Sequence, residues 1–324
     1  MLNNENVKDM ISTQPPSGGL WDVAIIGSGP ASLTAAIYTT RGAASTIIFA
    51  GESWGGQLML TSTVDNFPGF PQGIEGPDLM INMKNQATRF GALFLEKKAE
   101  SVVIDKNPFQ IKTGNDIYSA KSLIIATGAV TKWLGAEGEQ KLIGRGVSSC
   151  APCDAPFFKN KKVIVVGGGD SAMEEALVLS KYASEVFVVH RRDTFKASKI
   201  MQDKVFKNEK IKVIWNSEIT KLVGDQKLEK VSIKNIIKNE ISDMQIDGVF
   251  VAIGHIPESQ IVEGKLKLDE KGFIIPKQNS YTHIDGVFVA GDVHDHRYKQ
   301  AITAAGFGCM AGMDALSYLD NLGN

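Results

Sequence analysis

Short apolar runs that end in glycine-rich turns recur along this chain of 324 residues. The run 23–26 ends at Gly27-Ser28-Gly29, and small or apolar residues continue from 33 to 37. A strand-length apolar run, a tight turn and a helix-length segment predict the start of a βαβ unit. Residues 46–49 form the next apolar run, where the crossover would place a second parallel strand.

The same pattern recurs 140 residues further along, from Gly27 to Gly167. The apolar run 163–166 precedes Gly167-Gly168-Gly169, and residues 173–179 and 186–189 supply the predicted helix and second strand. Two other apolar runs end in the pattern Ala-x-Gly, at Gly128 and at Gly254. This duplication predicts an α/β protein with two Rossmann-like dinucleotide-binding domains.

The order of the repeats predicts that the second domain is inserted into the first. A third apolar run, which ends at Gly291-Asp292, would return the chain to the first domain. We expect a flexible N-terminal extension and two joining segments near 128–135 and 254–257, about which the inserted domain would rotate. The expected domains are 1–20 (extension), 21–130 and 257–324 (first domain), and 131–256 (inserted domain).

Each glycine in such a fingerprint has its own physical role. The first permits the tight turn, the second admits the pyrophosphate, and the third position must be small. Gly27, Gly29 and Ser32 fill these positions in the first domain. Gly167, Gly169 and Ala172 fill them in the inserted domain. For either motif alone a glycine-rich turn without a ligand is the alternative, and the duplication argues against it.

Cations follow the second strand of the inserted domain, at His190-Arg191-Arg192 and Lys196. A carboxylate at this place binds a ribose 2′-OH, whereas cations accommodate a 2′-phosphate. The sequence therefore favours NADPH over NADH, with a solvated basic turn as the alternative. The first domain has Ala50-Gly51-Glu52 at the corresponding place, which leaves its ribose contact open.

Cys150 and Cys153 form the sole close pair among three cysteines. Thiols at this spacing can close a redox disulfide, and Asp154 directly after them could move protons, although a solvated turn acid is the simpler interpretation of that carboxylate. A zinc site would lack two ligands, because Cys309 lies far along the chain in a small-residue stretch typical of a packed thiol. We expect no metal.

Composition limits the remaining function classes. Hydrophobic residues make up 43% and charged residues 22% of the chain, and the formal net charge is −1. These values are typical of a folded globular protein and give no electrostatic reason to expect a nucleic-acid partner. No apolar run approaches the roughly 18 residues of a membrane span. With few cysteines and no recognisable targeting segment, we expect a cytoplasmic protein.

Together these motifs resemble the low-molecular-weight thioredoxin reductases, which are NADPH- and FAD-dependent disulfide reductases. The resemblance runs from about Asp22 to Leu319. It implies that the first domain binds FAD, that the inserted domain binds NADPH, that thioredoxin is the partner, and that the protein is a homodimer. Further matching motifs are Gly55-Gly56-Gln57-Leu58, Asn66-Phe67-Pro68-Gly69, Phe195-Lys196-Ala197, Gly291-Asp292-Val293 and Tyr298-Lys299-Gln300-Ala301-Ile302.

The resemblance also implies residue roles. Cys153 would face the flavin, Cys150 would attack the thioredoxin disulfide, and Asp154 would be the acid. Asp292 would bind the ribityl chain. The FAD residues would be Gly27, Ser28, Gly29, Pro30, Ala31, Gly55, Gly56, Gln57, Asn66, Thr127, Gly128, Gly291, Asp292, Gln300 and Ala301. The NADPH residues would be Gly167, Gly169, Asp170, Ser171, Ala172, His190, Arg191, Arg192, Lys196 and Gly254.

Four residues depart from the family pattern: Ser32, Pro152, Ala155 and Lys196. Ser32 is expected to loosen the packing of the first domain, and Pro152 and Ala155 to alter the stiffness of the cysteine loop. Lys196 keeps the charge of the usual arginine without its bidentate geometry. Two alternative functions are a reductase for another protein disulfide and a non-catalytic nucleotide-sensing module.

Overall fold

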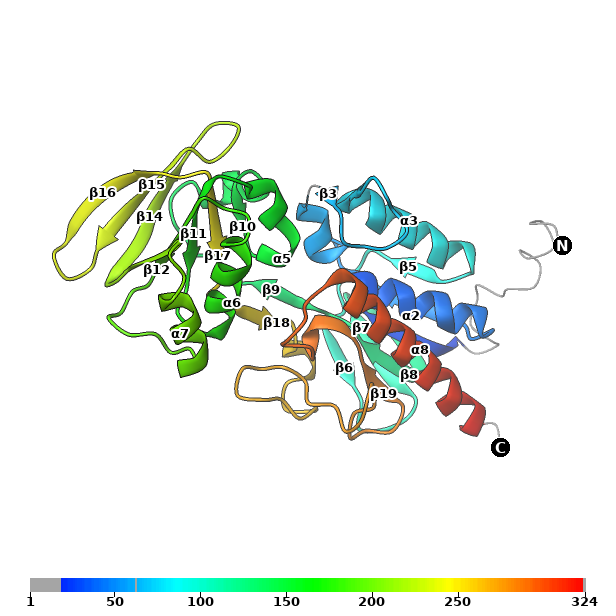
Figure 1. Ribbon diagram of the computed structural model, residues 1–324. Helices are drawn as coiled ribbons and strands as arrows, with labels where there is room; N and C mark the ends of the chain where they lie inside the picture. Colours follow the sequence, from blue (N-terminus) through cyan, green and yellow to red (C-terminus); the bar gives the residue numbers. More distant parts are fainter. Residues whose placement is uncertain (1–18, 62, 323–324) are drawn as a thin grey trace. The chain divides into compact units, whose positions relative to one another are not determined.

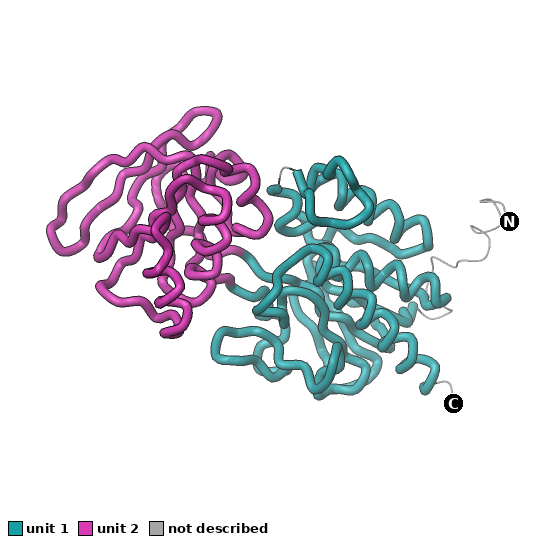
Figure 2. Tube along the Cα trace, in the orientation of Figure 1, with its two compact units in different colours: residues 1–130, 256–324 teal, residues 131–255 magenta. Residues whose placement is uncertain are grey.

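The computed structural model describes residues 19–61 and 63–322 and divides into two compact units (Figure 2). Unit 1 combines residues up to 130 with those from 256 onward, and unit 2 comprises residues 131–255. Both divisions fall within the expected joining segments. Most of the expected N-terminal extension lies outside the described residues, but Leu20, assigned to it, belongs to the first strand.

Unit 1 is built on a seven-stranded sheet whose central strands are β1 (Leu20–Ile26) and β8 (Asp116–Ile125) (Figure 1). Parallel strands extend the sheet from β1. On the other edge of β8, β7 pairs antiparallel with its first half and β19 pairs parallel with its second half. The segment that follows unit 2 thus completes the sheet begun before it. The remaining strands are β2 (Thr46–Phe49), β5 (Leu93–Leu95), β6 (Ser101–Val103), β7 (Phe109–Thr113) and β19 (Val287–Val289).

Three helices, α2 (Pro30–Arg41), α3 (Gly76–Arg89) and α8 (Ala301–Leu322), belong to unit 1. Small residues bring α2 and α8 together, because a Cβ on Gly308 would lie 2.1 Å from the carbonyl oxygen of Ala31. The side chains of β1 alternate between two cores: Val23 and Ile25 pack in the cluster that contains α2 and α8, and Ala24 and Ile26 pack on the opposite face. Burial on both faces explains the continuous apolar run.

Unit 2 contains a five-stranded parallel sheet in the order β10-β17-β11-β12-β13 and a separate antiparallel sheet, β14-β15-β16. Val163 and Val165 of β11 pack in the cluster that contains α6, and Ile164 and Val166 pack in the cluster that contains β14 and β15. The bounds are β10 (Val147–Ser148), β11 (Lys162–Val166), α6 (Asp170–Leu179), β12 (Glu185–Val189), α7 (Lys199–Phe206), β13 (Ile211–Ile214), β14 (Ser217–Val223), β15 (Lys230–Asn235), β16 (Glu240–Gln245) and β17 (Gly248–Val251).

The two chain connections between the units run through β9 (Ala129–Thr131) and β18 (His255–Pro257), which pair with each other. The other short elements are η1 (Gly56–Leu60), β3 (Thr63–Val64), β4 (Ile74–Glu75), α4 (Glu139–Leu142), α5 (Ala151–Asp154), η2 (Ala155–Phe158), η3 (Gln260–Val262) and η4 (Gly291–Val293). The predicted fold class, an α/β chain with two Rossmann-like domains, is confirmed. Among the described residues, no helix has the length and apolar character needed to cross a membrane.

Candidate functional site

The fingerprint turn of unit 1 connects β1 to α2 and leaves open space at its second glycine. Gly27 has a φ of +123°, and a Cβ there would lie 2.0 Å from the carbonyl oxygen of Ala126. A Cβ on Gly29 would meet no atom within 4 Å. Pro30 opens the helix, where its missing N–H is no loss. The turn therefore offers free backbone N–H groups at a helix N-terminus, a suitable place for a phosphate group.

Two serine hydroxyls hold this turn in place. Ser28 Oγ donates to the carbonyl oxygen of Ala50 at 2.9 Å and accepts from Gly55 N at 3.0 Å. Ser32, which is 0% exposed, donates from Oγ to the carbonyl oxygen of Gly27 at 2.7 Å. This buried hydroxyl therefore has a partner and ties the turn to the helix, which argues against the loosening expected at Ser32.

Several predicted FAD residues from distant parts of unit 1 lie beside the fingerprint. A Cβ on Gly56 would lie 3.9 Å from Gly29 Cα, and one on Gly291 would lie 2.8 Å from Ala31 Cβ. Gly55 and Gly56 both have positive φ, and Gln57 follows them in η1 as an exposed side chain. The structure thus brings the loop before η1 and the segment after β19 to the same turn.

Asp292, in η4 directly after β19, carries a buried carboxylate atom without a partner. Its Oδ1 has no hydrogen-bond partner among the described residues. Burial raises the pKa of Asp292 to about 7, and the nearby Asp295 carboxylate adds to the effect. A buried acceptor of this kind needs a donor, such as a hydroxyl group of a bound molecule. This observation fits the ribityl contact that the resemblance implies for Asp292.

The turn that leads into α8 is held by a residue that sequence reasoning missed. The carboxylate of Asp295 accepts from the backbone N–H groups of Arg297, Tyr298 and Lys299. An aspartate two residues before a turn often does this, so its position carried a weak signal. Gln300 then precedes the helix, and its Oε1 accepts from Asn66 Nδ2 at 3.2 Å. Asn66, Gln300 and Ala301 therefore lie close together, as predicted for one site.

Thr127 and Gly128 contact the segment that returns to unit 1. Thr127 Oγ1 donates to the carbonyl oxygen of Glu258 at 2.5 Å, and Glu258 N donates to the carbonyl oxygen of Gly128 at 2.9 Å. The Thr127 hydroxyl is therefore engaged within the protein. The predicted contact of Thr127 with FAD would therefore be made by its backbone, which lies next to Ala126 and the first fingerprint glycine.

The fingerprint turn of unit 2 repeats the arrangement of unit 1. A Cβ on Gly167 would lie 2.5 Å from the carbonyl oxygen of Ala252 and 2.7 Å from Ala172 Cβ. A Cβ on Gly169, which precedes α6, would meet no atom within 4 Å. The Ala-x-Gly ends of β8 and β17 thus have the same role, which is to lie against the first glycine of the neighbouring turn.

Asp170 and Ser171 occupy the first turn of α6 with different surroundings. The Asp170 carboxylate accepts from Ser198 N at 2.9 Å and Ser198 Oγ at 2.7 Å, and these bonds lower the pKa of Asp170. Asp170 therefore anchors the residue that precedes α7. Ser171 is exposed, so its hydroxyl is accessible to a ligand at the helix N-terminus.

His190 is buried against the fingerprint turn instead of facing solvent with the neighbouring arginines. A Cβ on Gly168 would lie 2.2 Å from His190 Cε1, and His190 Nε2 is hydrogen-bonded to the carbonyl oxygen of Thr194 at 3.0 Å. Its ring also contacts Phe195 and Trp215. Burial lowers the pKa of His190, which favours the neutral ring. The imidazole thus supports the loop from within.

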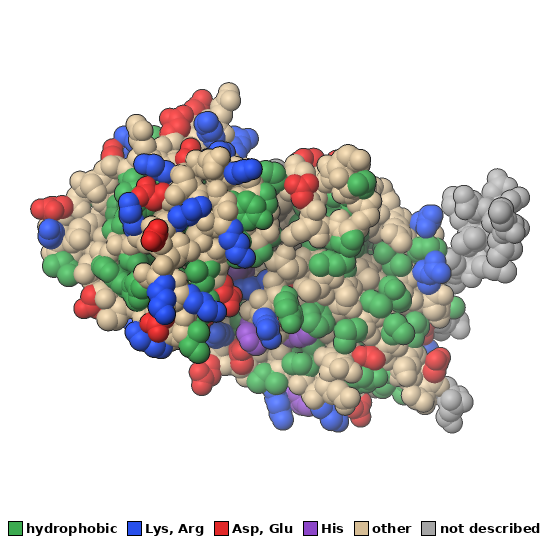
Figure 3. All heavy atoms as spheres, in the orientation of Figure 1, with side chains coloured by type: hydrophobic (Ala, Val, Ile, Leu, Met, Phe, Trp, Pro, Cys, Tyr) green, Lys and Arg blue, Asp and Glu red, His purple; other side chains and the backbone are tan. Residues whose placement is uncertain are grey.

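The three predicted phosphate-binding cations, Arg191, Arg192 and Lys196, are exposed. None of them forms an ion pair in the described part of the chain. Lys196 N donates to the carbonyl oxygen of Gly168 at 2.7 Å, which fixes this loop to the fingerprint. Lysine and arginine side chains gather on the face of unit 2 seen in Figure 3. Gly254, also predicted here, has a φ of +110°.

Cys150 and Cys153 form a disulfide at the start of α5, with Cα atoms 5.3 Å apart. The N–H groups of Cys153 and Asp154 donate to the carbonyl oxygen of Cys150, which closes one helical turn. Pro152 occupies the first turn, where a proline is favourable, and Ala155 has a right-handed helical conformation that requires no glycine. The turn thus accommodates both departures from the family pattern.

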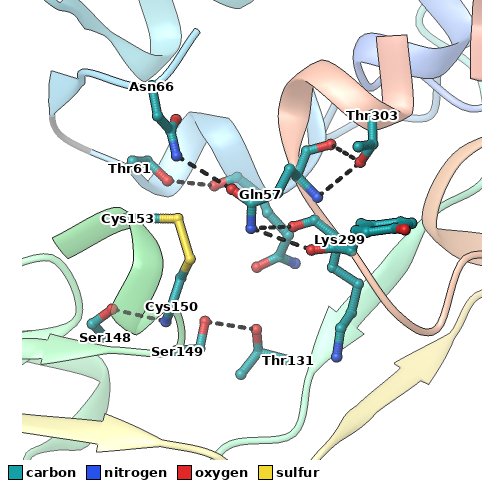
Figure 4. The surroundings of a disulfide bond; sticks show 12 residues. Gln57, Thr61, Asn66, Thr131, Ser148, Ser149, Cys150, Cys153, Lys299 and Thr303 are labelled. Carbon is teal, nitrogen blue, oxygen red and sulfur yellow. Dashed lines mark hydrogen bonds between the residues drawn. A yellow bond between two sulfur atoms is a disulfide. The ribbon is translucent and has the colours of Figure 1, made fainter. Parts of the chain in front are cut away.

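Ser148, two residues before the disulfide, contacts the backbone of its first cysteine. Its Oγ accepts from Cys150 N at 3.0 Å, as the dashed line in Figure 4 shows. Burial raises the pKa of Asp154, and the Ser148 hydroxyl opposes this shift. Sequence reasoning missed Ser148, because a serine before a turn is common. Ser149 instead accepts from Thr131 Oγ1 at 3.1 Å.

Cys309 is a free, partly buried thiol in α8. Its Sγ lies 3.9 Å from Met313 Sδ. This contact agrees with the packed thiol that the small-residue stretch predicts. Among the described residues, no group of three His, Cys, Asp or Glu side chains is arranged to hold a metal ion.

Comparison with known proteins gives consistent matches. The family model for pyridine nucleotide-disulphide oxidoreductases matches residues 21–308. The thioredoxin reductase of Rickettsia conorii is 48% identical over 303 residues, which are 92% of this chain and 98% of that protein. The thioredoxin reductase of Chlamydia pneumoniae is 50% identical over 304 residues, 91% of this chain and 97% of that protein.

Solved structures match as well. Thioredoxin reductase from Giardia duodenalis superimposes with a TM-score of 0.89 at 41% identity, covering 93% of this chain and 99% of that one. Thioredoxin reductase from Streptococcus pyogenes superimposes with a TM-score of 0.90 at 38% identity, covering 94% of this chain and 100% of that one. These similarities extend over both units.

Proposed function

The chain belongs to the thioredoxin reductases of the pyridine nucleotide-disulphide oxidoreductase family, and we propose that it reduces a thioredoxin disulfide with electrons from NADPH. FAD and NADPH are the cofactors that this membership implies. The observation that carries the proposal is the Cys150–Cys153 disulfide, which lies beside the partly buried acid Asp154 in a chain with two dinucleotide fingerprints.

Unit 1 supplies the residues that would hold FAD. The open backbone at Gly29 suits the pyrophosphate, and the unpartnered Asp292 carboxylate suits a ribityl hydroxyl. Bound FAD would supply two-electron transfer between nicotinamide and disulfide. The proposed ligands are Gly27, Ser28, Gly29, Pro30, Ala31, Gly55, Gly56, Gln57, Asn66, Thr127, Gly128, Gly291, Asp292, Gln300 and Ala301.

Unit 2 supplies the residues that would hold NADPH. Gly169 and Ser171 lie at the open helix N-terminus, and the exposed Arg191, Arg192 and Lys196 suit the 2′-phosphate. Gly167, Ala172, His190 and Asp170 support these ligands through packing and hydrogen bonds. Gly254 completes the proposed set by its position after the Ala-x-Gly strand.

The reaction at the cysteines follows thiol–disulfide exchange. In the reduced pair, the Cys150 thiolate attacks one sulfur of the thioredoxin disulfide, which forms a mixed disulfide and releases a thioredoxin thiolate. Protonated Asp154 gives its proton to that leaving thiolate. The Cys153 thiolate then attacks Cys150 Sγ, which restores the Cys150–Cys153 disulfide and releases the second thioredoxin sulfur as a thiolate that takes its proton from solvent. The resemblance assigns Cys153 to the flavin-dependent reduction of the pair.

The test is NADPH oxidation by the purified yellow protein with thioredoxin and a chromogenic disulfide. We expect thioredoxin-dependent turnover that prefers NADPH to NADH and is lost in Cys153→Ser. The matched control is Cys309→Ser, which should keep the activity because Cys309 lies in α8, outside the pair. Turnover that survives Cys153→Ser would contradict the proposal. Flavin reduction without thioredoxin turnover would instead indicate another protein disulfide as the substrate.

The same resemblance leads us to propose a cytoplasmic homodimer without a nucleic-acid partner. The near-balanced net charge of −1 supports the last point. Light scattering of the purified protein measures the oligomeric state, and a monomer at micromolar concentration would contradict the dimer. Retention on heparin at physiological salt would contradict the absence of a polyanion partner.

A further inference from the structure

One lysine ammonium group in unit 1 lies against two aromatic rings. Lys84 of α3 has its Nζ 4.3 Å from the ring centre of Trp54 and 4.2 Å from that of Phe94 in β5. The two rings form a T-shaped pair with centres 5.6 Å apart. The same Nζ forms an ion pair with Glu96 at 2.8 Å, and the Lys84 side chain is 23% exposed. Partial removal from water strengthens the attraction between a cation and an aromatic ring.

Trp54 belongs to the loop that leads from β2 to η1. The start of this loop is bound to β5, because Ala50 N donates to the carbonyl oxygen of Leu95 at 2.8 Å. Its end is bound to the fingerprint turn, because Gly55 N donates to Ser28 Oγ at 3.0 Å. Trp54 and Gly55 share a peptide bond. The position of the indole ring is therefore directly linked to the position of the Gly55 N–H group.

The loop has little else to hold it in one conformation. Gly51, Gly55 and Gly56 all have positive φ, a region that glycine populates about as readily as negative φ. Trp54 is the one large apolar side chain among residues 51–56, and it packs against the core of unit 1. Lys84 therefore contacts the side chain that fixes this loop.

We propose that Lys84 is a positioning residue for FAD, because its ammonium group holds the Trp54 ring and thereby fixes the loop that brings Gly55 and Gly56 to the fingerprint turn. The inference rests on the proposed function, in which both glycines are FAD ligands. A Cβ on Gly56 would lie 3.9 Å from Gly29 Cα, where the pyrophosphate is proposed. A loop that is ordered before the ligand arrives binds it more tightly, since less conformational entropy is lost on binding.

The first experiment measures the dissociation constant of FAD, from the FAD that passes an ultrafilter when the yellow holoenzyme is diluted. Lys84→Met removes the charge and keeps an unbranched side chain, and Lys84→Arg keeps the charge. Glu96→Gln removes the ion pair and leaves both ring contacts. Lys97→Met is the matched control, because Lys97 forms a comparable ion pair with Asp116 at 2.9 Å and lies over no aromatic ring in the described part of the chain.

We expect Lys84→Met to raise the dissociation constant of FAD about 10-fold, which corresponds to about 1.4 kcal/mol. Lys84→Arg should bind FAD as the wild type does. Glu96→Gln and Lys97→Met should change the constant less than about 2-fold, because exposed ion pairs contribute little. In the Trp54→Leu background, Lys84→Met should add less than about 2-fold, since the ring that the ammonium group holds is absent.

The second experiment measures how readily acrylamide quenches the emission of Trp54 in the holoenzyme. The chain has four tryptophans, so the Trp54 signal is the difference between each protein and its Trp54→Leu counterpart. Quenching should increase in Lys84→Met, because the ring is released, and should keep its wild-type value in Lys84→Arg and Lys97→Met. This signature separates a role at Trp54 from a general contribution of Lys84 to stability.

Equal FAD affinity in wild type and Lys84→Met would overturn the proposal. A 10-fold loss that persists in the Trp54→Leu background, or unchanged quenching of Trp54 in Lys84→Met, would overturn it as well. Should Lys84→Met fail to fold, Lys84→Gln removes the charge with a polar side chain and is judged by the same two measurements. Neither measurement uses NADPH or thioredoxin. A failure of the proposed thioredoxin activity is therefore distinguishable from a failure of the role assigned to Lys84.

Discussion

The fingerprint turns of the two units share their backbone arrangement and differ in their charged side chains. In each unit the first glycine lies against an alanine carbonyl, from Ala126 in unit 1 and Ala252 in unit 2, and the second glycine faces open space. After the second strand, unit 1 continues with an uncharged Ala-Gly pair and Glu52, and unit 2 continues with exposed arginines.

This difference distinguishes the features that bind any dinucleotide from the features that recognise one particular dinucleotide. A pyrophosphate is common to FAD and NADPH, and it is recognised by backbone N–H groups that require glycine. The 2′-phosphate of NADPH is recognised by cations. Unit 1 instead adds Asp292, a buried carboxylate from the segment that returns after unit 2. The shared backbone and the differing side chains can therefore be tested separately by mutation.

The largest effect is expected at the first glycines. Gly27→Ala places a Cβ 2.0 Å from a backbone oxygen at positive φ, so we expect more than about 4 kcal/mol of destabilisation and loss of bound flavin. Gly167→Ala should retain flavin, because unit 1 is unchanged, but should lose NADPH-dependent flavin reduction. Flavin absorbance measures the bound flavin and its reduction by NADPH, and thermal unfolding measures the stability. Yellow Gly27→Ala protein with wild-type stability would contradict the steric argument.

A pH effect is expected at Asp292 in flavin-free protein. Its pKa rises from 3.8 to about 7 on folding, so its contribution to stability is full below the unfolded pKa and is lost as pH rises through 7, by on the order of 4 kcal/mol. Asp292→Asn should remove this loss, making the variant more stable than wild type at pH 8, and should weaken FAD binding. Unfolding in urea from pH 4 to pH 8 measures the stability.

Asp170 in unit 2 is the matched control for Asp292, since its pKa is lowered on folding. Its contribution to stability is present above the unfolded pKa and is lost as pH falls through the folded pKa. Asp170→Asn should therefore lower the free energy of unfolding at neutral pH. The loss of stability between pH 4 and pH 8 should remain in this variant. Equal pH dependence in wild type and Asp292→Asn would rule out the role of burial at Asp292.

Nucleotide preference should respond to the cations of unit 2 alone. The double variant Arg191→Gln, Arg192→Gln removes two charge-assisted contacts, and we expect the KM for NADPH to rise about 10- to 100-fold with little change for NADH. Glu52→Gln in unit 1 is the control and should leave both constants unchanged. Steady-state kinetics with both nucleotides decide the matter, and an equal rise for NADH would show that the arginines do not recognise the 2′-phosphate.

The smallest effect is expected at the third position of the fingerprint. Ser32→Ala removes the buried hydrogen bond to the carbonyl oxygen of Gly27, which should cost about 1 kcal/mol and lower the Tm by a few degrees. Ser171→Ala in unit 2 removes an exposed hydroxyl and should leave the Tm unchanged. Differential scanning calorimetry resolves both, and a Tm increase in Ser32→Ala would show that Ser32 loosens the packing after all.

Local patterns in the sequence were sufficient for the repeated βαβ units and for most of the candidate site. The strands predicted at 46–49 and 186–189 coincide with β2 and most of β12, because strands buried on both faces require continuous apolar runs. The glycines of the fingerprints and the cysteine pair were equally visible, since glycine and cysteine are the residues that such turns and such chemistry require.

The direction and surroundings of polar side chains depended on the tertiary structure. His190 belongs to the same basic run as Arg191, yet it is buried beneath Gly168. Asp170 anchors Ser198, and Ser148 accepts the backbone N–H of Cys150. The number of residues between two side chains does not give the distance between them in space, so such contacts cannot be read from the sequence. The sequence by itself determined the two nucleotide folds and the redox pair, and only the tertiary structure decided which neighbouring polar groups hold them in place, because hydrogen bonds depend on positions in space.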